Sequence, residues 1–177
     1  MSRLKIIPPE QMTPAQHAAY AEAVAAGTPN GTTGGPYTAW IRTPEFMRLH
    51  RETGHYLQHN SLSPRVRQIV VLRTIKYWGA KFPWSVQVRA SLKVGLEQVL
   101  IDALEHGETP ALASAQEAGA LKFSTELLET KRVSETTYKE TLALFGEAGV
   151  VDLVSTIGSF CLTSLTAIAF DIDPPKD

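Results

Sequence analysis

The segment from Ser63 to Gly95 constrains this chain most, because its pattern predicts two helices joined by a short turn. A Ser-Pro dipeptide opens the segment, and such a pair favours a helix start because the hydroxyl caps a free amide and proline needs none there. Gly79 predicts the end of the first helix, and Phe82-Pro83 opens a second that ends at Gly95. Apolar residues recur at helical spacing in the first helix, at Val66, Ile69, Val70, Leu72 and Ile75. The opposite side carries cations whose charges can stay in water: Arg65, Arg67, Arg73 and Lys76.

Two glutamines of this helix pair have largely apolar or small helical neighbours. Gln68 lies three, four and seven residues before Val71, Leu72 and Ile75. Gln87 is similarly placed among Pro83, Trp84, Ala90 and Ser91, so both amides are predicted to point towards the interior. A buried amide without a partner costs about 1 to 3 kcal/mol. Three explanations follow: a ligand, a structural network, or a hydrogen bond between the two glutamines that fixes the helix register.

The run SPRVRQIVVL, followed by YWGAKFPWSVQVRASLKVGL, resembles the carboxymuconolactone decarboxylase-like family. That family shares its all-helical fold with the alkyl hydroperoxide reductase D-type proteins. GPYTAWIRTPEFMRLH resembles the family's segment before the helix pair, and LFGEAGVVDLVSTIGSF resembles its closing helix. The resemblance covers most of the chain from about residue 35 onward. It implies an all-α, alkyl hydroperoxide reductase D-like bundle that forms a homo-oligomer, a trimer or a hexamer.

The chain departs from this family at the positions that carry its chemistry. Peroxidase members use a Cys-x-x-Cys pair with a nearby histidine, whereas Cys161 is the single cysteine here, which argues against thiol peroxidase activity. Many lactone- and carboxylate-processing members carry a glutamate on the first helix and a glutamate and a histidine on the second. The matching positions hold Gln68, Pro83 and Gln87, and glutamine cannot act as a general base.

The first functional hypothesis is a cofactor-independent lyase, such as a decarboxylase, acting on a small carboxylate or lactone without a metal. Gln87 and Gln68 would donate hydrogen bonds to a developing enolate, and His50 would supply the proton. Trp84 and Pro83 would form the substrate-binding wall. The alternative is a non-catalytic small-molecule binder or accessory oligomer that kept the fold and lost the acid and base residues.

His50 is the one histidine that the pattern predicts to face inwards. It belongs to a helix that starts at Thr43-Pro44, whose inward stripe is predicted to comprise Phe46, His50, Thr53, Gly54 and Leu57. His55 and His59 have a spacing that can bind a metal, but no third ligand accompanies them. We therefore expect these two histidines to be solvated.

The remaining pattern predicts helices throughout and no strand, in one domain spanning residues 1–177 with a peripheral N-terminal helix and a glycine-rich connector within residues 1–35. A helix is expected from Thr13-Pro14 to near Gly27, and the following segment to Pro36 is either a connector, which we favour, or a lid. Another helix ends at Gly107 with a buried side expected to comprise Leu96, Val99, Leu100, Ala103 and Leu104. Thr109-Pro110 is predicted to open a helix that runs to Lys131, and Ser134 to cap the next one.

The last predicted helix, from about Ala148 to Phe170, is apolar on almost every side. Asp152 and several serines and threonines argue against a transmembrane span. Such a helix must be covered on all sides, by the rest of this chain and by a second copy of it. The structural reading of Cys161 is a small, inert, buried side chain.

The net charge and the N-terminal sequence limit the partners and the cellular compartment that we expect. The formal net charge is -1 with cations and anions interspersed, which argues against a nucleic-acid partner. The N-terminal residues lack the apolar run of a signal peptide, and a single cysteine cannot form an internal disulfide. We therefore expect a cytoplasmic protein whose partners are a small molecule and copies of itself, with no membrane contact.

Overall fold

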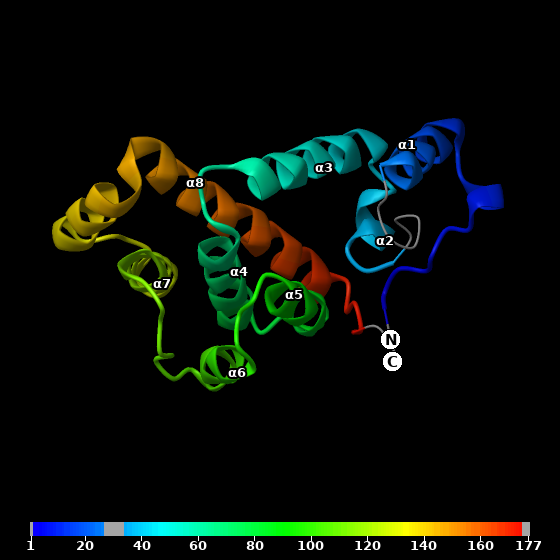
Figure 1. Ribbon diagram of the computed structural model, residues 1–177. Coiled ribbons are helices and arrows are strands. Elements are labelled where there is room, and N and C mark those ends of the chain that lie inside the picture. Colours follow the sequence, from blue (N-terminus) through cyan, green and yellow to red (C-terminus); the bar gives the residue numbers. More distant parts are fainter. Residues whose placement is uncertain (1, 27–33, 175–177) are drawn as a thin grey trace.

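The computed structural model describes residues 2–26 and 34–174, and this part of the chain is all-helical (Figure 1), as the sequence predicts. Residues 27–33, which make up most of the predicted connector or lid, lie outside the described residues. A short 3-10 turn at Pro9–Gln11 precedes the helices. The α-helices are α1 (Pro14–Ala25), α2 (Tyr37–Trp40), α3 (Pro44–His59), α4 (Pro64–Trp78), α5 (Lys81–Lys93), α6 (Gln98–His106), α7 (Ala115–Thr130) and α8 (Glu135–Ala169).

Helix α4 is the centre of the bundle and packs against α5, α6, α7 and α8. The Ser63 hydroxyl accepts a hydrogen bond from the Val66 amide, and Gly79 ends the helix in the left-handed conformation with φ 66°. Burial extends around most of the helix, because the covered residues are Val66, Ile69, Val70, Val71, Leu72, Thr74 and Ile75. The predicted central helix pair is therefore confirmed.

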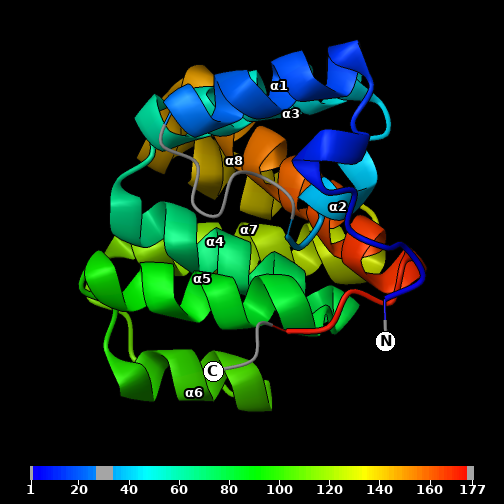
Figure 2. The same cartoon turned by 90° about the vertical axis from the view of Figure 1, so that its right-hand side faces the viewer.

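The helices are arranged in layers when the molecule is viewed from the side (Figure 2). Helices α1 and α3 lie at the top, α4 and α5 lie below them, and α6 lies at the bottom. The N-terminal segment crosses to the end of α8, where the Arg3 amide donates to the Phe170 carbonyl at 2.9 Å and the Arg3 guanidinium contacts Asp171 at 2.7 Å. The beginning of the described chain is thereby fixed to the end of its last helix.

Helix α8 is two helical pieces joined at Gly146, whose φ of 66° and ψ of 176° are not helical. The bend is visible in Figure 1. The second piece matches the apolar helix predicted from about Ala148, and the bundle covers only part of it. Large apolar side chains stay exposed along its outer side: Val151, Val154, Leu162, Leu165 and Ile168. Helix α8 is long and apolar enough to cross a membrane, but core helices of globular proteins can have the same length and composition.

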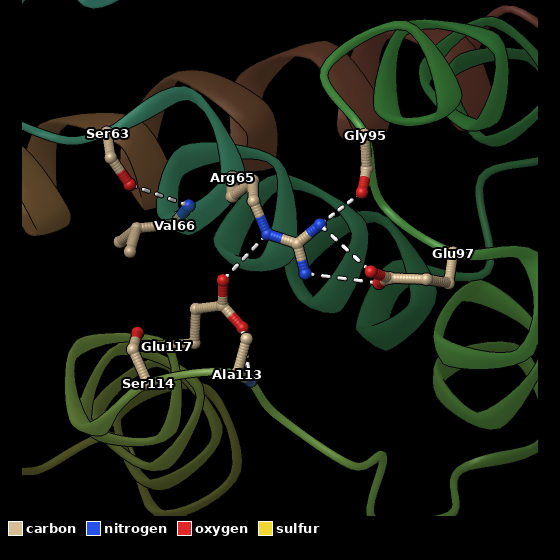
Figure 3. A network of polar contacts seen from close by, with 8 residues as sticks. All are labelled: Ser63, Arg65, Val66, Gly95, Glu97, Ala113, Ser114 and Glu117. Carbon is tan, nitrogen blue, oxygen red and sulfur yellow. Dashed lines mark hydrogen bonds and ion pairs between the residues drawn. The ribbon is translucent and has the colours of Figure 1, made fainter.

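A polar network centred on Arg65 fastens α4 to the chain around α6 and α7 (Figure 3). Arg65 Nε donates to Glu117 Oε1 at 2.8 Å, and Arg65 Nη2 donates to Glu97 Oε2 at 3.1 Å. The Gly95 carbonyl accepts from Arg65 as well, and the other Glu117 oxygen accepts from the Ala113 amide at 2.9 Å. Arg65 is therefore not the purely solvated cation that the sequence pattern indicates.

Three predicted details are wrong for local reasons. Helix α7 starts at Ala115 instead of at Pro110, because the Ser114 hydroxyl caps the Glu117 amide and so sets the helix start. On α6, Val99 is 76% exposed while Ile101 is fully buried. On α3, Met47 is fully buried, whereas Phe46 and Thr53 are exposed. The buried faces of α3 and α6 thus differ from the predicted ones by a rotation of about one residue, within the ambiguity of short amphipathic patterns.

Candidate functional site

The two glutamines are both half-buried at the contact of α4 and α5, but they do not bond to each other. Gln68 Oε1 accepts a hydrogen bond from the hydroxyl of Ser91, a buried α5 residue one helical turn beyond Gln87, at 3.4 Å. The Gln87 amide has no hydrogen-bond partner among residues 2–26 and 34–174. The glutamine pair that the sequence allows is therefore replaced by a Gln68–Ser91 contact, and the half-buried Gln87 amide has no partner in this part of the chain.

His50 is placed in an aromatic cluster instead of beside the glutamines. Its ring centroid lies 4.0 Å from that of Trp40, and burial lowers the pKa of its imidazole. Trp40 is fixed in turn by a 3.3 Å hydrogen bond from its indole nitrogen to the Thr166 hydroxyl on α8. Helix α3 packs against α1, α2 and α8, whereas α5 packs against α4 and α8. The structure thus puts the predicted proton source in a different group of helices from Gln68 and Gln87.

Trp84 lines a cavity of about 370 Å³ at the beginning of α5. Ile75, Ala80 and Trp84 give it apolar walls, while Lys76, Lys81 and Glu105 contribute charges. Ser85, Gly79 and Pro174 complete the described lining. Pro83 is buried in the first turn of α5 and does not line the cavity, and neither glutamine lines it. Of the predicted substrate-binding residues, only Trp84 therefore faces this space.

The electrostatics of this cavity suit a small anion. Two ammonium groups and one carboxylate line it, so its formal charge is positive. Ala80, the N-cap of α5, makes no side-chain capping bond, so the first amides of the helix have no cap. A helix N-terminus carries a partial positive charge that attracts carboxylates and phosphates. In the sequence, this site could have been found from the helix break at Gly79 followed by a new helix start. The helical pattern did not reveal the role of Lys76, because it predicted only a solvated charge there.

The exposure of the two α3 histidines agrees with the prediction, whereas Cys161 is less buried than predicted. His55 and His59 are exposed and stack on each other with ring centroids 4.4 Å apart, as expected for solvated residues. The described residues contain no group of three potential metal ligands. Cys161 is half-buried, and its sulfur accepts a hydrogen bond from the Trp78 indole nitrogen at 3.2 Å. One thiol cannot form the disulfide of a two-cysteine peroxidase cycle.

A second polar cluster, which the sequence pattern did not reveal, surrounds Asp152. This carboxylate is 3% exposed and accepts hydrogen bonds from the Tyr56 hydroxyl at 2.6 Å, the Ser61 hydroxyl at 2.6 Å and the Ser61 amide at 2.9 Å. Burial raises the pKa of Asp152, but these hydrogen bonds outweigh burial and leave the pKa below its ordinary value. The cluster joins α3 and the turn between α3 and α4 to α8, which is a structural role.

No protein-family model matches this chain. The curated proteins include no match either.

Solved structures do match over most of the chain. An uncharacterized peroxidase-related protein from Ralstonia eutropha with an alkylhydroperoxidase AhpD core aligns with a TM-score of 0.80 at 13% identity, covering 99% of this chain and 93% of that one. A protein of unknown function from Agrobacterium tumefaciens, described as a candidate AhpD antioxidant defence protein, aligns with a TM-score of 0.71 at 18% identity, covering 78% and 97%. These likenesses show the fold, and the chain has the AhpD-like helical fold that the resemblance of its sequence implies.

Proposed function

We propose that this protein binds a small carboxylate or a carboxylate-bearing lactone in the cavity beside Trp84. The observation that carries the proposal is the cavity itself: about 370 Å³ of space with an indole wall, two lysines and the uncapped start of α5. Pockets of this size, with mostly apolar walls and a few polar groups, are typical of small-molecule sites. The aromatic wall suits a planar or ring-shaped body, and the positive groups suit the carboxylate.

Cofactor-independent decarboxylation is the second candidate function, in keeping with a carboxymuconolactone decarboxylase-like protein. It is favoured by the apolar walls at Ile75, Ala80 and Trp84, which disfavour a localised carboxylate relative to a transition state whose charge is spreading. In such a reaction the bond to the carboxyl carbon breaks, carbon dioxide leaves, and the electron pair forms an enolate that takes a proton from solvent. His50 does not line the described cavity, so this candidate has no proton source among the predicted residues. Binding is therefore the function that the geometry supports best.

The experiment is thermal unfolding with and without a panel of small aromatic and lactone carboxylates. A ligand at 100 times its dissociation constant should add about 2.7 kcal/mol of stability, or roughly 5 to 10 °C for a chain of this size. Lys81→Met should weaken that shift, whereas Lys93→Met, at the other end of α5 and exposed, should preserve it. Equal shifts in both variants, or none in the native protein, would exclude the Trp84 cavity as the site.

Any compound that binds is then tested for release of carbon dioxide. Turnover in the native protein that Lys81→Met lowers and Lys93→Met preserves supports the decarboxylase candidate, because Lys81 lines the cavity and Lys93 does not. Binding without turnover supports the non-catalytic binder. Because Gln87 does not line this cavity, Gln87→Leu should change the unfolding midpoint but not the affinity for the ligand.

A further inference from the structure

A groove of about 810 Å³ lies among α4, α7 and the chain that follows α6. Its apolar lining includes Leu104, Leu112 and Leu121. Its volume lies within the range of about 300 to 1,000 Å³ that is typical of small-molecule pockets. The groove is thus large enough for a ligand with an alkyl chain, and the Trp84 cavity is a separate, smaller space.

Arg73 is the polar residue that distinguishes this groove. Although the helical pattern assigns it to the solvent side of α4, its side chain is only 13% exposed. Arg73 Nε donates to the Thr125 hydroxyl at 2.9 Å, and Nη2 forms an ion pair with Glu129. The Nη1 group has no acceptor within the described part of the chain. The guanidinium is therefore held in one orientation by two bonds while part of its donor edge remains free.

The charged side chains of the groove lining balance formally, because it holds three cations and three carboxylates: Arg73, Lys76, Lys122, Glu108, Glu126 and Glu129. Lys122 is paired with Glu140 at 2.6 Å, and Glu126 accepts a hydrogen bond from the Ser134 amide at 2.6 Å. Neither Lys76 nor Glu108 has an ion-pair partner among residues 2–26 and 34–174, and Glu108 is exposed on the chain after α6. The donors of the lining that remain unpaired within the described residues are thus on Arg73 Nη1 and Lys76, which lets the groove accept a carboxylate although its formal charge is zero.

We propose that this groove binds an amphipathic monocarboxylate: an alkyl chain packed on the leucines, with its carboxylate bonded to Arg73 Nη1 and near Lys76. Charge-assisted bonds from a pre-oriented guanidinium give the head group its specificity. Burial of the alkyl chain supplies most of the affinity. This site is independent of the Trp84 cavity, although the long Lys76 side chain borders both spaces.

Calorimetric titration with octanoate, and with octanamide as a neutral ligand of the same shape, tests the proposal. The native protein should bind octanoate at least about tenfold more tightly than octanamide, because charged hydrogen bonds are the stronger ones. Arg73→Leu should remove that preference while keeping weak binding of both. Ala118→Trp, on an exposed position that lines the groove, should block both ligands without disturbing Arg73.

Matched controls separate these effects from general destabilisation. Arg48→Leu also removes an Arg–Glu ion pair, in this case with Glu22 on α1, and should bind octanoate like the native protein. Ala21→Trp places the same bulky side chain at an exposed site on α1 and should likewise have no effect. If Arg73→Leu does not fold, Ala118→Trp and the octanamide comparison still decide the question.

Three results would overturn the proposal. Octanamide binding as tightly as octanoate would show that the carboxylate does not contribute to recognition. Octanoate binding that survives Ala118→Trp and is lost in Lys81→Met would place the ligand in the Trp84 cavity. A change in the native mass on Ala118→Trp would mark the groove as a subunit contact. Because the two sites are tested with different variants, failure here leaves the Trp84 proposal standing.

Discussion

Asp152 lies in an apolar helix and is nearly inaccessible, yet three donors from α3 and the turn that follows it surround its carboxylate. A buried charge is tolerated only when its hydrogen bonds replace hydration. The same bonds hold the pKa of Asp152 below its ordinary value against the opposing effect of burial. At the residue scale, this carboxylate is a structural anchor, and its polar partners explain why an acid persists in that helix.

Replacing this acid tests the anchor. Asp152→Asn keeps the shape but removes the charge and replaces one of the two acceptor oxygens with a donor, so the free energy of unfolding should fall by about 2 to 3 kcal/mol. Urea unfolding at neutral pH measures the loss. Glu147→Gln removes an exposed carboxylate from the same helix and should change stability very little. Equal losses in the two variants would contradict the anchor role.

The pH dependence of the same group has a definite sign. Because the pKa of Asp152 is lower in the folded than in the unfolded protein, its stabilising contribution is fully present above the unfolded value of about 3.9 and is lost as pH falls through the folded value. The native protein should therefore lose stability on acidification below about pH 4 more steeply than Asp152→Asn does. Urea unfolding of both proteins across this pH range measures the two slopes, and parallel slopes would contradict the assignment.

At the scale of elements, the Arg65 network connects three segments that are distant in the sequence (Figure 3). Glu117 is 4% exposed, and its two oxygens accept from Arg65 on α4 and from the Ala113 amide. The hydrogen bonds to Glu117 and then to Glu97 raise the pKa of Arg65, so this group stays charged at every ordinary pH. The network thereby fixes where α7 begins relative to α4.

Breaking one side of this pair should cost more than removing both sides. Arg65→Met leaves a buried carboxylate without its cation and should lower the free energy of unfolding by about 2 to 4 kcal/mol, with partial exposure of Arg65 moderating the loss. The double variant with Glu117→Met should recover part of it. Denaturant unfolding of both variants measures the difference, and a double variant that is less stable than Arg65→Met would refute the explanation.

Gly146 sets the bend between the two pieces of α8. Its backbone conformation is one that only glycine adopts readily, although a Cβ added at this residue would meet no atom within 4 Å. Gly146→Ala should therefore destabilise by about 1 to 3 kcal/mol through the backbone alone. Gly54→Ala, in the middle of α3 with equally open space, should instead stabilise by up to about 1 kcal/mol. Thermal unfolding compares the two, and the same sign for both would be incompatible with this reasoning.

At the scale of the whole molecule, the second piece of α8 leaves an apolar row uncovered at Val151, Val154, Leu162, Leu165 and Ile168. Exposed apolar rows of this kind are typical of subunit interfaces. A homo-oligomer that covers the row remains our proposal, with a trimer or a hexamer as the expected assembly.

Light scattering after size-exclusion chromatography tests that assembly. The native protein should have a mass that is a multiple of 19.4 kDa, and Leu165→Glu should reduce it, because a charge cannot be buried unpaired in an apolar contact. Val99→Glu introduces the same charge at a 76% exposed position on α6 and should leave the mass unchanged. A monomeric native protein would end the proposal.

The sequence predicted the fold well because the helix boundaries here depend on local capping and breaking residues. The Ser63 cap, the left-handed Gly79 and the helix start at Pro44 depend on neighbours within a few residues. Helical spacing alone also identified most of the buried face of α4. The candidate site was predicted less well: Trp84 lines a cavity, but Gln68 bonds to Ser91, and His50 lies among the aromatic residues of another helix group.

The local sequence and the tertiary packing therefore account for different features of this protein. The sequence by itself determined the all-helical class and the central helix pair, because propensity and capping are local properties. The tertiary structure alone decided that Arg73 lines a groove, that Asp152 is satisfied by Tyr56 and Ser61, and that Lys76 and Lys81 share a cavity with Trp84. These contacts join residues from different helices, and packing brings them together in a way that no local pattern encodes.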